Sequence, residues 1–209
     1  MSFTKLKQAT VALMALGMLT ACGSNTDKIV ETIKTEVQAD EAAVAQLQTT
    51  MTSQADFMDS FDDLLKDAAK KYEKVEEVLA DMQAQATTLK TGFESAQASL
   101  TFDENEEAKL TKMLAKAEKE ENYENASKLV EAYQTYRTNL EALSTNNVEL
   151  MSKYEDFLGQ ITGDMEFQVL EDLIGGLNKV LGTVQKSYDD YTASAQEFQT
   201  LLMDSQSAE

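Results

Sequence analysis

Apolar side chains recur alternately three and four residues apart from Val30 to Leu100, and nineteen of the 21 positions in this register are apolar or aromatic. A repeat that averages 3.5 residues places these side chains on one stripe of an α-helix, the stripe that packs against a neighbouring helix. The pattern therefore predicts long helices that lie side by side. The positions are Val30, Ile33, Val37, Asp40, Val44, Leu47, Met51, Gln54, Met58, Phe61, Leu65, Ala68, Tyr72, Val75, Leu79, Met82, Ala86, Leu89, Phe93, Ala96 and Leu100.

The composition supports an all-α fold. The 209 residues include no proline and eight glycines, so the residues that usually punctuate β-rich folds are scarce. Ala, Leu, Glu, Lys and Gln, which all favour helices, dominate instead. The length fits one domain, and the predicted fold is an elongated antiparallel up-and-down helical bundle with coiled-coil-like packing.

Asp40 and Gln54 are the two polar exceptions in the first stripe. Gln54 follows Ser53, a residue that could cap the N-terminus of a new helix with Asp56 in its first turn. We therefore expect a break or kink near residues 52–54, although the stripe alone would allow one continuous helix.

Two further stripes follow, over residues 110–161 and 167–202. Asp103 and Glu106 resemble a capping box that starts the first of them. Within it, the polar segment 118–125 offers only Tyr123 to a core and is either a solvated helix surface at the end of the molecule or a local fray. In the last stripe the pair Gly175-Gly176 predicts either a close neighbouring helix or a kink.

These boundaries predict an antiparallel bundle of four helices of about 25, 47, 59 and 40 residues, joined by short connections. A bundle of three helices with one very long first helix is the alternative. The bundle domain is expected over residues 27–204, followed by a frayed tail at 205–209.

The N-terminus has the pattern of a secretory signal. Lys5 and Lys7 precede an uncharged apolar run over residues 9–19, and the chain turns polar directly after Cys22, its only cysteine. The run is shorter than the ~20 residues that a membrane-spanning helix needs. Residues 1–21 are therefore predicted to be a signal peptide.

Leu19-Thr20-Ala21-Cys22 resembles a bacterial lipobox. The resemblance implies cleavage between Ala21 and Cys22 and a diacylglyceryl group on the cysteine thiol, with residues 22–26 as the lipidated N-terminus and tether. Two acyl chains anchor a protein stably, whereas one gives only reversible binding. The alternatives are an ordinary signal peptide with a chance cysteine, or a free buried thiol.

The chain is strongly acidic. Its formal net charge is −19, and cleavage after Ala21 would remove Lys5 and Lys7 and no acidic residue, which gives a mature charge of −21. Nucleic-acid binding depends on Lys and Arg that neutralise phosphates, so a nucleic-acid partner is not expected. A cationic partner, or one bridged by divalent metal, remains open, and like charge also keeps a helical rod soluble.

Catalytic motifs are scarce in this sequence. With no histidine, it has no Ser-His or Cys-His pair and no Glu-x-x-His metal motif. Adjacent acids on a helix do not face each other, which favours solvated surfaces over the paired carboxylates of a glycoside hydrolase. We expect no catalytic residues, metal site, cofactor or small-molecule substrate, with an envelope hydrolase as a minor alternative. The acid pairs are Asp62-Asp63, Glu76-Glu77, Glu106-Glu107, Glu120-Glu121 and Asp189-Asp190.

Two of the seven tyrosines, Tyr123 and Tyr136, lie off the main stripes. They are the candidates for exposed contacts with a ligand. The other five fall on the stripes and are expected in the core, or half-buried with the hydroxyl reaching water.

The lipobox, residues 56–77 (DFMDSFDDLLKDAAKKYEKVEE) and residues 170–198 (LEDLIGGLNKVLGTVQKSYDDYTASAQEF) together resemble the YkyA-type family of cell-wall-binding lipoproteins of Gram-positive bacteria. The resemblance covers most of the mature chain. It implies a four-helix bundle on the outer face of the cytoplasmic membrane and transfers no catalytic residues. This chain is more acidic than the Lys-rich helices usual in that family.

These observations predict a non-enzymatic surface lipoprotein, held to the membrane through Cys22, that binds or organises a component of the cell envelope, such as the cell wall. The alternative is an extracytoplasmic adaptor or chaperone-like partner of a secreted or membrane protein. Long heptad stripes that could accept a partner helix, together with the negative charge, motivate that alternative.

Overall fold

The structure is a computed structural model that describes residues 24–68, 73–100, 104–161 and 167–207. These residues form five helices and no strand. The helices are α1 (Asn25–Ala68), α2 (Glu73–Ser99), α3 (Glu104–Ala117), α4 (Tyr123–Gln160) and α5 (Phe167–Ser207). The prediction of an all-α helical bundle is confirmed.

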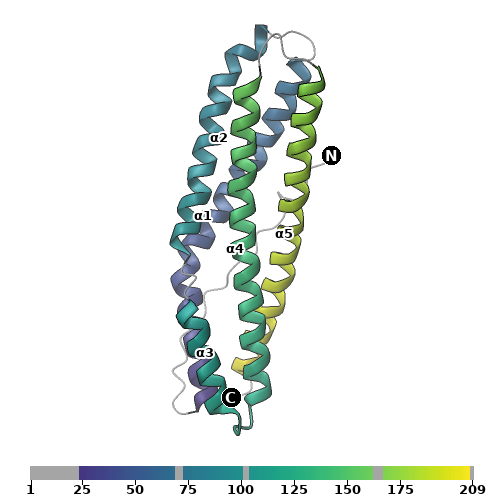
Figure 1. The fold of residues 1–209 in the computed structure, drawn as a ribbon. Coiled ribbons are helices and arrows are strands. Elements are labelled where there is room, and N and C mark those ends of the chain that lie inside the picture. The colour runs from purple at the N-terminus through teal and green to yellow at the C-terminus, as the bar shows by residue number, and fades with distance from the viewer. Residues whose placement is uncertain (1–23, 69–72, 101–103, 162–166, 208–209) are drawn as a thin grey trace.

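Along the long axis of the bundle, α1 and α4 run in one direction and α2, α3 and α5 run in the other (Figure 1). α1 begins at the end that we call proximal, where α3 also meets α4, and reaches the distal end, where α2 and α5 begin. α2 and α3 together return along α1, because Gly92 of α2 lies against Thr50 and Met113 of α3 contacts Thr32. α4 then runs up and α5 runs down beside it.

The predicted break at residues 52–54 is wrong. α1 continues through Ser53, whose hydroxyl donates a hydrogen bond to the carbonyl of Thr49 inside the helix. Gln54 is fully buried in mid-helix, so its polar character marks a polar position in the core. A residue that favours helix caps, such as serine, is also tolerated within a helix when its hydroxyl bonds to a carbonyl of the preceding turn.

The single helix expected over residues 103–161 is also wrong. α3 ends at Ala117 and α4 begins at Tyr123. In the turn between them, the N–H of Glu120 donates to the carbonyl of Ala117 (2.8 Å) and the N–H of Tyr123 donates to that of Glu120 (3.2 Å). The charged segment 118–122 reverses the chain at the proximal end, so α3 and α4 are antiparallel neighbours.

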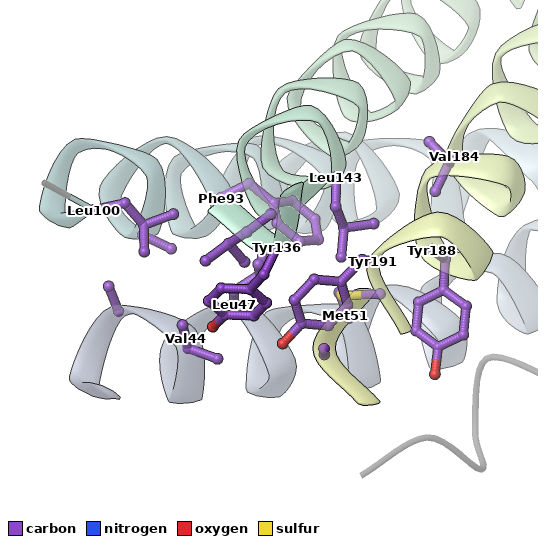
Figure 2. Packing of buried hydrophobic residues seen from close by; sticks show 14 of the residues in the cluster. Val44, Leu47, Met51, Phe93, Leu100, Tyr136, Leu143, Val184, Tyr188 and Tyr191 are labelled. Carbon is purple, nitrogen blue, oxygen red and sulfur yellow. The ribbon is translucent and has the colours of Figure 1, made fainter. Parts of the chain in front are cut away.

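The predicted stripes form the core. Along the first stripe, all residues whose burial is described are buried or half-buried. Figure 2 shows core side chains from different helices: Leu47 comes from α1, Phe93 from α2, Leu143 from α4 and Tyr191 from α5. Toward the distal end, Phe61 makes edge-on ring contacts with Tyr154 (4.9 Å between centroids) and Phe157 (5.0 Å).

α5 is one helix throughout, so Gly175 and Gly176 do not interrupt it. A Cβ placed on either glycine would meet nothing within 4 Å, so no neighbouring helix passes close there. The helix also extends to Ser207, and residues 205–207 are therefore helical where a frayed tail was predicted. Residues 208–209 lie outside the described part of the chain.

Candidate functional site

The N-terminus of α1 is the described part of the chain nearest to the predicted lipidation site. Ala21 and Cys22, like the signal peptide over residues 1–21, lie outside the described residues. Ser24 and Asp27 form a reciprocal capping box: the N–H of Ser24 donates to the Asp27 carboxylate, and the N–H of Asp27 donates to Ser24 Oγ, both at 3.0 Å. α1 begins at Asn25, so residues 25 and 26 of the predicted tether belong to the bundle.

Glu120, from the turn between α3 and α4, closes this helix end. Its carboxylate accepts hydrogen bonds from the backbone N–H groups of Asn25 and Thr26, each at 3.0 Å, and from the side-chain amide of Asn25 at 2.7 Å. The N–H donors of Thr26 and Asn25, in that order, lower the pKa of Glu120 below its usual 4.5, against a smaller opposing effect of burial. A negative charge here also complements the positive end of the helix dipole.

These contacts hold the start of α1 firmly. Thr26 is buried, and the first turn of α1 is bonded both within itself and to the turn at 118–122. In the sequence, the predicted attachment point at Cys22 precedes Ser24, the first residue of this structured end, by two positions. The sequence offered a signal in the acidic segment around Glu120, but the partner lies 95 residues away.

The two tyrosines predicted to be exposed are not equivalent. Tyr136 is only 4% exposed and packs against Phe198 (5.3 Å between ring centroids) and Tyr191 (5.8 Å), so its prediction as an exposed contact is wrong. Burial raises its pKa well above the usual value. Tyr123 is half-buried against the core at the start of α4, at the proximal end.

A buried ion pair joins α1 to α4. Arg137 Nη1 lies 3.1 Å from Asp40 Oδ2, with both side chains at most 10% exposed. The same Nη1 donates to the Tyr133 hydroxyl at 2.7 Å, and the guanidinium carbon lies 5.6 Å from the centre of that ring. Asp40, one of the two polar exceptions in the first stripe, therefore has a charged partner in the core, which favours one register of α1 against α4.

A second polar layer lies further along the same two helices. Gln54 Nε2 of α1 contacts Met151 Sδ of α4 at 3.4 Å. Asn147 and Ser144 lie one and two turns below Met151, respectively, on the same face of α4 and are fully buried. Within the described part of the chain, Gln54 Oε1, Ser144 Oγ and Asn147 Oδ1 have no hydrogen-bond partner.

The acid pairs described by the structure lie mostly on helix surfaces. Asp63 pairs with Lys66 at 2.9 Å, and Asp190 pairs with Lys186. Among the described residues, no cluster of three or more His, Cys, Asp or Glu could hold a metal ion. Among the same residues, no helix has the length and apolar character that crossing a bilayer requires.

Comparison with known proteins gives no relative. No protein-family model matches the chain. No curated protein and no solved structure is significantly similar to it.

Proposed function

We propose that the chain is a surface lipoprotein, anchored through a diacylglyceryl group on Cys22, that has a non-enzymatic binding or structural role on the outer face of the cytoplasmic membrane. The observation that carries the proposal is the lipobox-like sequence Leu19-Thr20-Ala21-Cys22, at the junction of an apolar signal and a polar start. The resemblance to YkyA-type lipoproteins points the same way.

The geometry of the proximal end gives this proposal a definite form. Ser24 is already hydrogen-bonded in the cap of α1, so only Gly23 separates Cys22 from the bundle. Two residues span at most about 7 Å, so we expect an acylated Cys22 to hold the proximal end near the lipid headgroups. The 44 residues of α1 then carry the distal end about 65 Å outward.

The proposed partner is a component of the cell envelope, and the cell wall is the first candidate because of the family resemblance. The half-buried Tyr123 lies at the proximal end, so an upright bundle would keep it near the membrane. A partner further out would meet α1, α2, α4 and α5 at their distal halves. An adaptor role for a secreted or membrane protein is the second candidate, favoured by the apolar residues of α5 described below.

The anchor is tested with a Cys22→Ala variant expressed in a Gram-positive host. We expect the unmodified protein to sediment with membranes and its N-terminal peptide to carry two acyl chains by mass spectrometry, whereas the variant loses both properties. Ser24→Ala is the matched control, because it changes the cap of α1 and keeps the cysteine. Equal fractionation of both proteins without lipid would refute the anchor.

The orientation has its own test. With Cys22 acylated, a single new cysteine can be labelled selectively, since the sequence contains no other. A fluorophore at Glu121→Cys, in the proximal turn, should be quenched by nitroxide-labelled lipids, and one at Asp63→Cys, near the distal end of α1, should not. Equal quenching at both positions would indicate a bundle that lies flat on the membrane.

A further inference from the structure

The two halves of α5 are buried to very different extents. From Val184 to Leu202 its apolar stripe is in the core, with exposed fractions of 2–8%. From residue 169 to 181 the stripe continues in the sequence, but only Leu177 is buried, and Val169 is 41% exposed. The remaining apolar residues there are only half-buried. We call this set the distal apolar face: Val169, Leu170, Leu173, Ile174, Val180 and Leu181.

The distal apolar face is incompletely covered because α5 has one close neighbour. Its backbone runs close to that of α4, whereas α1 and α5 scarcely approach each other in the described residues. In the proximal half, the large side chain of Tyr191 bridges the wider spacing to α1, because its hydroxyl bonds to Gln48. In the distal half, Leu and Ile of α5 are shorter and leave their edges exposed.

The side of α1 that faces α5 becomes acidic over the same stretch. Gln48, which reaches Tyr191, is followed at heptad spacing by Ala55 and Asp62, so these three lie along one flank of the helix. Asp59 lies three turns above Gln48 on the same flank and is exposed. α5 adds the exposed Glu171 and Asp172 beside the apolar residues.

An apolar strip bordered by carboxylates complements one kind of partner, an amphipathic helix with an apolar face flanked by Lys or Arg. A second copy of the chain is a poor occupant, because a two-fold contact would bring the same acidic borders together. Anionic lipid is repelled by the same carboxylates.

We propose that the distal apolar face, with Asp59, Asp62, Glu171 and Asp172 as its acidic border, docks a basic amphipathic helix of another envelope or secreted protein. Apolar contact supplies affinity, and the carboxylates select the sign of the partner's charge. This inference deepens the proposed binding role by naming the class of partner, and it does not depend on the lipid anchor.

The probe is a Leu/Lys amphipathic peptide of about 18 residues, five turns of helix, and its counterpart is the same peptide with Glu for Lys. The protein is the full chain as cells produce it, held in phosphatidylcholine nanodiscs if it is acylated and free if it is not, so that failure of the anchor leaves this test intact. Binding is followed by fluorescence anisotropy, with empty nanodiscs as background. We expect the basic peptide to bind, more weakly at high salt, and the acidic peptide not to bind.

Variants on α5 locate the binding surface. Glu171→Lys and Val169→Ser should each weaken binding of the basic peptide about fivefold. Their matched controls, Glu197→Lys and Met203→Ser, make the same kinds of change at exposed positions of the proximal half, where Met203 is 44% exposed, and should leave affinity within about twofold. Circular dichroism melts of all four proteins show whether the fold is retained.

Three outcomes would overturn the inference. Equal binding of both peptides would show apolar adsorption without charge selection. Equal loss in the control variants would place the binding elsewhere on the molecule. Binding to phosphatidylcholine vesicles with none to either peptide would make the face a lipid contact.

Discussion

The carboxylate of Glu120 closes the N-terminus of α1 from a turn 95 residues further along the chain, accepting the backbone N–H of Asn25 and of Thr26 at 3.0 Å each. Since α1 begins three residues after the predicted lipidation site, we expect this contact to fix the direction in which the bundle would leave the membrane if Cys22 is acylated. The cap therefore bears on the proposed anchoring as well as on the stability of the fold.

Replacing Glu120 with Gln should loosen the start of α1. The amide keeps one acceptor oxygen but loses the negative charge that two N–H donors and the helix dipole favour. We expect faster hydrogen exchange at the amides of Asn25 and Thr26 and a lower melting temperature. Glu121→Gln, a change at the exposed next position, is the control and should leave both unchanged.

The same contact predicts a dependence on acid. The folded-state pKa of Glu120 is lowered from 4.5, so its contribution to stability is present above about pH 4.5 and is lost as the pH falls through the folded-state pKa. Urea unfolding of the unmodified protein and of Glu120→Gln should therefore differ at neutral pH and converge in acid. A constant difference down to about pH 2 would contradict the cap as the source.

The buried ion pair between Asp40 and Arg137 predicts strongly non-additive mutations. Asp40→Ala leaves the Arg137 guanidinium buried without its carboxylate partner and should cost about 3–5 kcal/mol of unfolding free energy. The double variant Asp40→Leu/Arg137→Met replaces both charges with apolar groups and should recover most of that loss. Denaturant unfolding of the two single variants and the double variant measures the coupling. Additive losses would mean that the pair contributes nothing as a pair.

The helical character and the core were predictable from the sequence because heptad spacing fixes which side chains share a helix face. Along the first stripe even the exceptions Asp40 and Gln54 are buried. What the spacing does not contain is where a helix stops. The same register runs from α1 into α2, although the chain reverses between Ala68 and Glu73, with no glycine or proline in the intervening residues. The packing of α2 against α1 decides where this reversal occurs.

Pairings across the bundle were beyond prediction for the same reason. Asp40 and Arg137 each stand out as polar positions in an apolar stripe, but their contact follows only when the reversals near residues 70 and 120 are both placed correctly. Tyr136 lies outside the main stripe, yet it is buried because α5 packs on that flank of α4. The heptad spacing identifies one buried face of a helix, whereas α4 buries two faces, one of them against α5.

Tyr191 predicts a loss of stability in alkali. Burial is the largest cause that raises its pKa from 10.0 to about 12, so the folded state keeps its proton after the unfolded state has lost it. Its contribution to stability is complete below about pH 10 and is lost as the pH rises toward about 12. The fall in unfolding free energy between about pH 9 and about pH 11 should be smaller in Tyr191→Phe. An identical fall in both proteins would assign the effect to other groups, such as the lysines.

Two buried serines should respond in opposite ways to alanine. Ser144 Oγ has no partner among the described residues, so Ser144→Ala should stabilise the protein by about 1 kcal/mol through removal of an unpaired hydroxyl and higher helix propensity. Ser187 Oγ accepts a hydrogen bond from Asn146 Nδ2 at 2.6 Å, so Ser187→Ala should destabilise it by about 1 kcal/mol. Equilibrium unfolding in urea measures both changes. A loss of stability in Ser144→Ala would show that its hydroxyl has a partner.

Glycines in α2 and α5 give a final matched comparison. Gly176 is exposed, with nothing within 4 Å of a Cβ placed on it, so Gly176→Ala should raise the unfolding free energy by about 0.5–1 kcal/mol. A Cβ on Gly92 would lie 3.0 Å from Thr50 Cγ2 and 3.1 Å from Thr50 Oγ1, because α1 and α2 approach closely there. Gly92→Ala gains the same helix propensity but overpacks this contact, and we expect a net loss of about 1 kcal/mol.

The double variant Gly92→Ala/Thr50→Ala separates these two effects. Truncating Thr50 removes both atoms that the new methyl group meets, so the double variant should be more stable than Gly92→Ala alone. Melting temperatures of the three alanine variants and the unmodified protein are sufficient to rank them. If Gly92→Ala proved as stabilising as Gly176→Ala, the close approach of α1 and α2 at Thr50 would be contradicted.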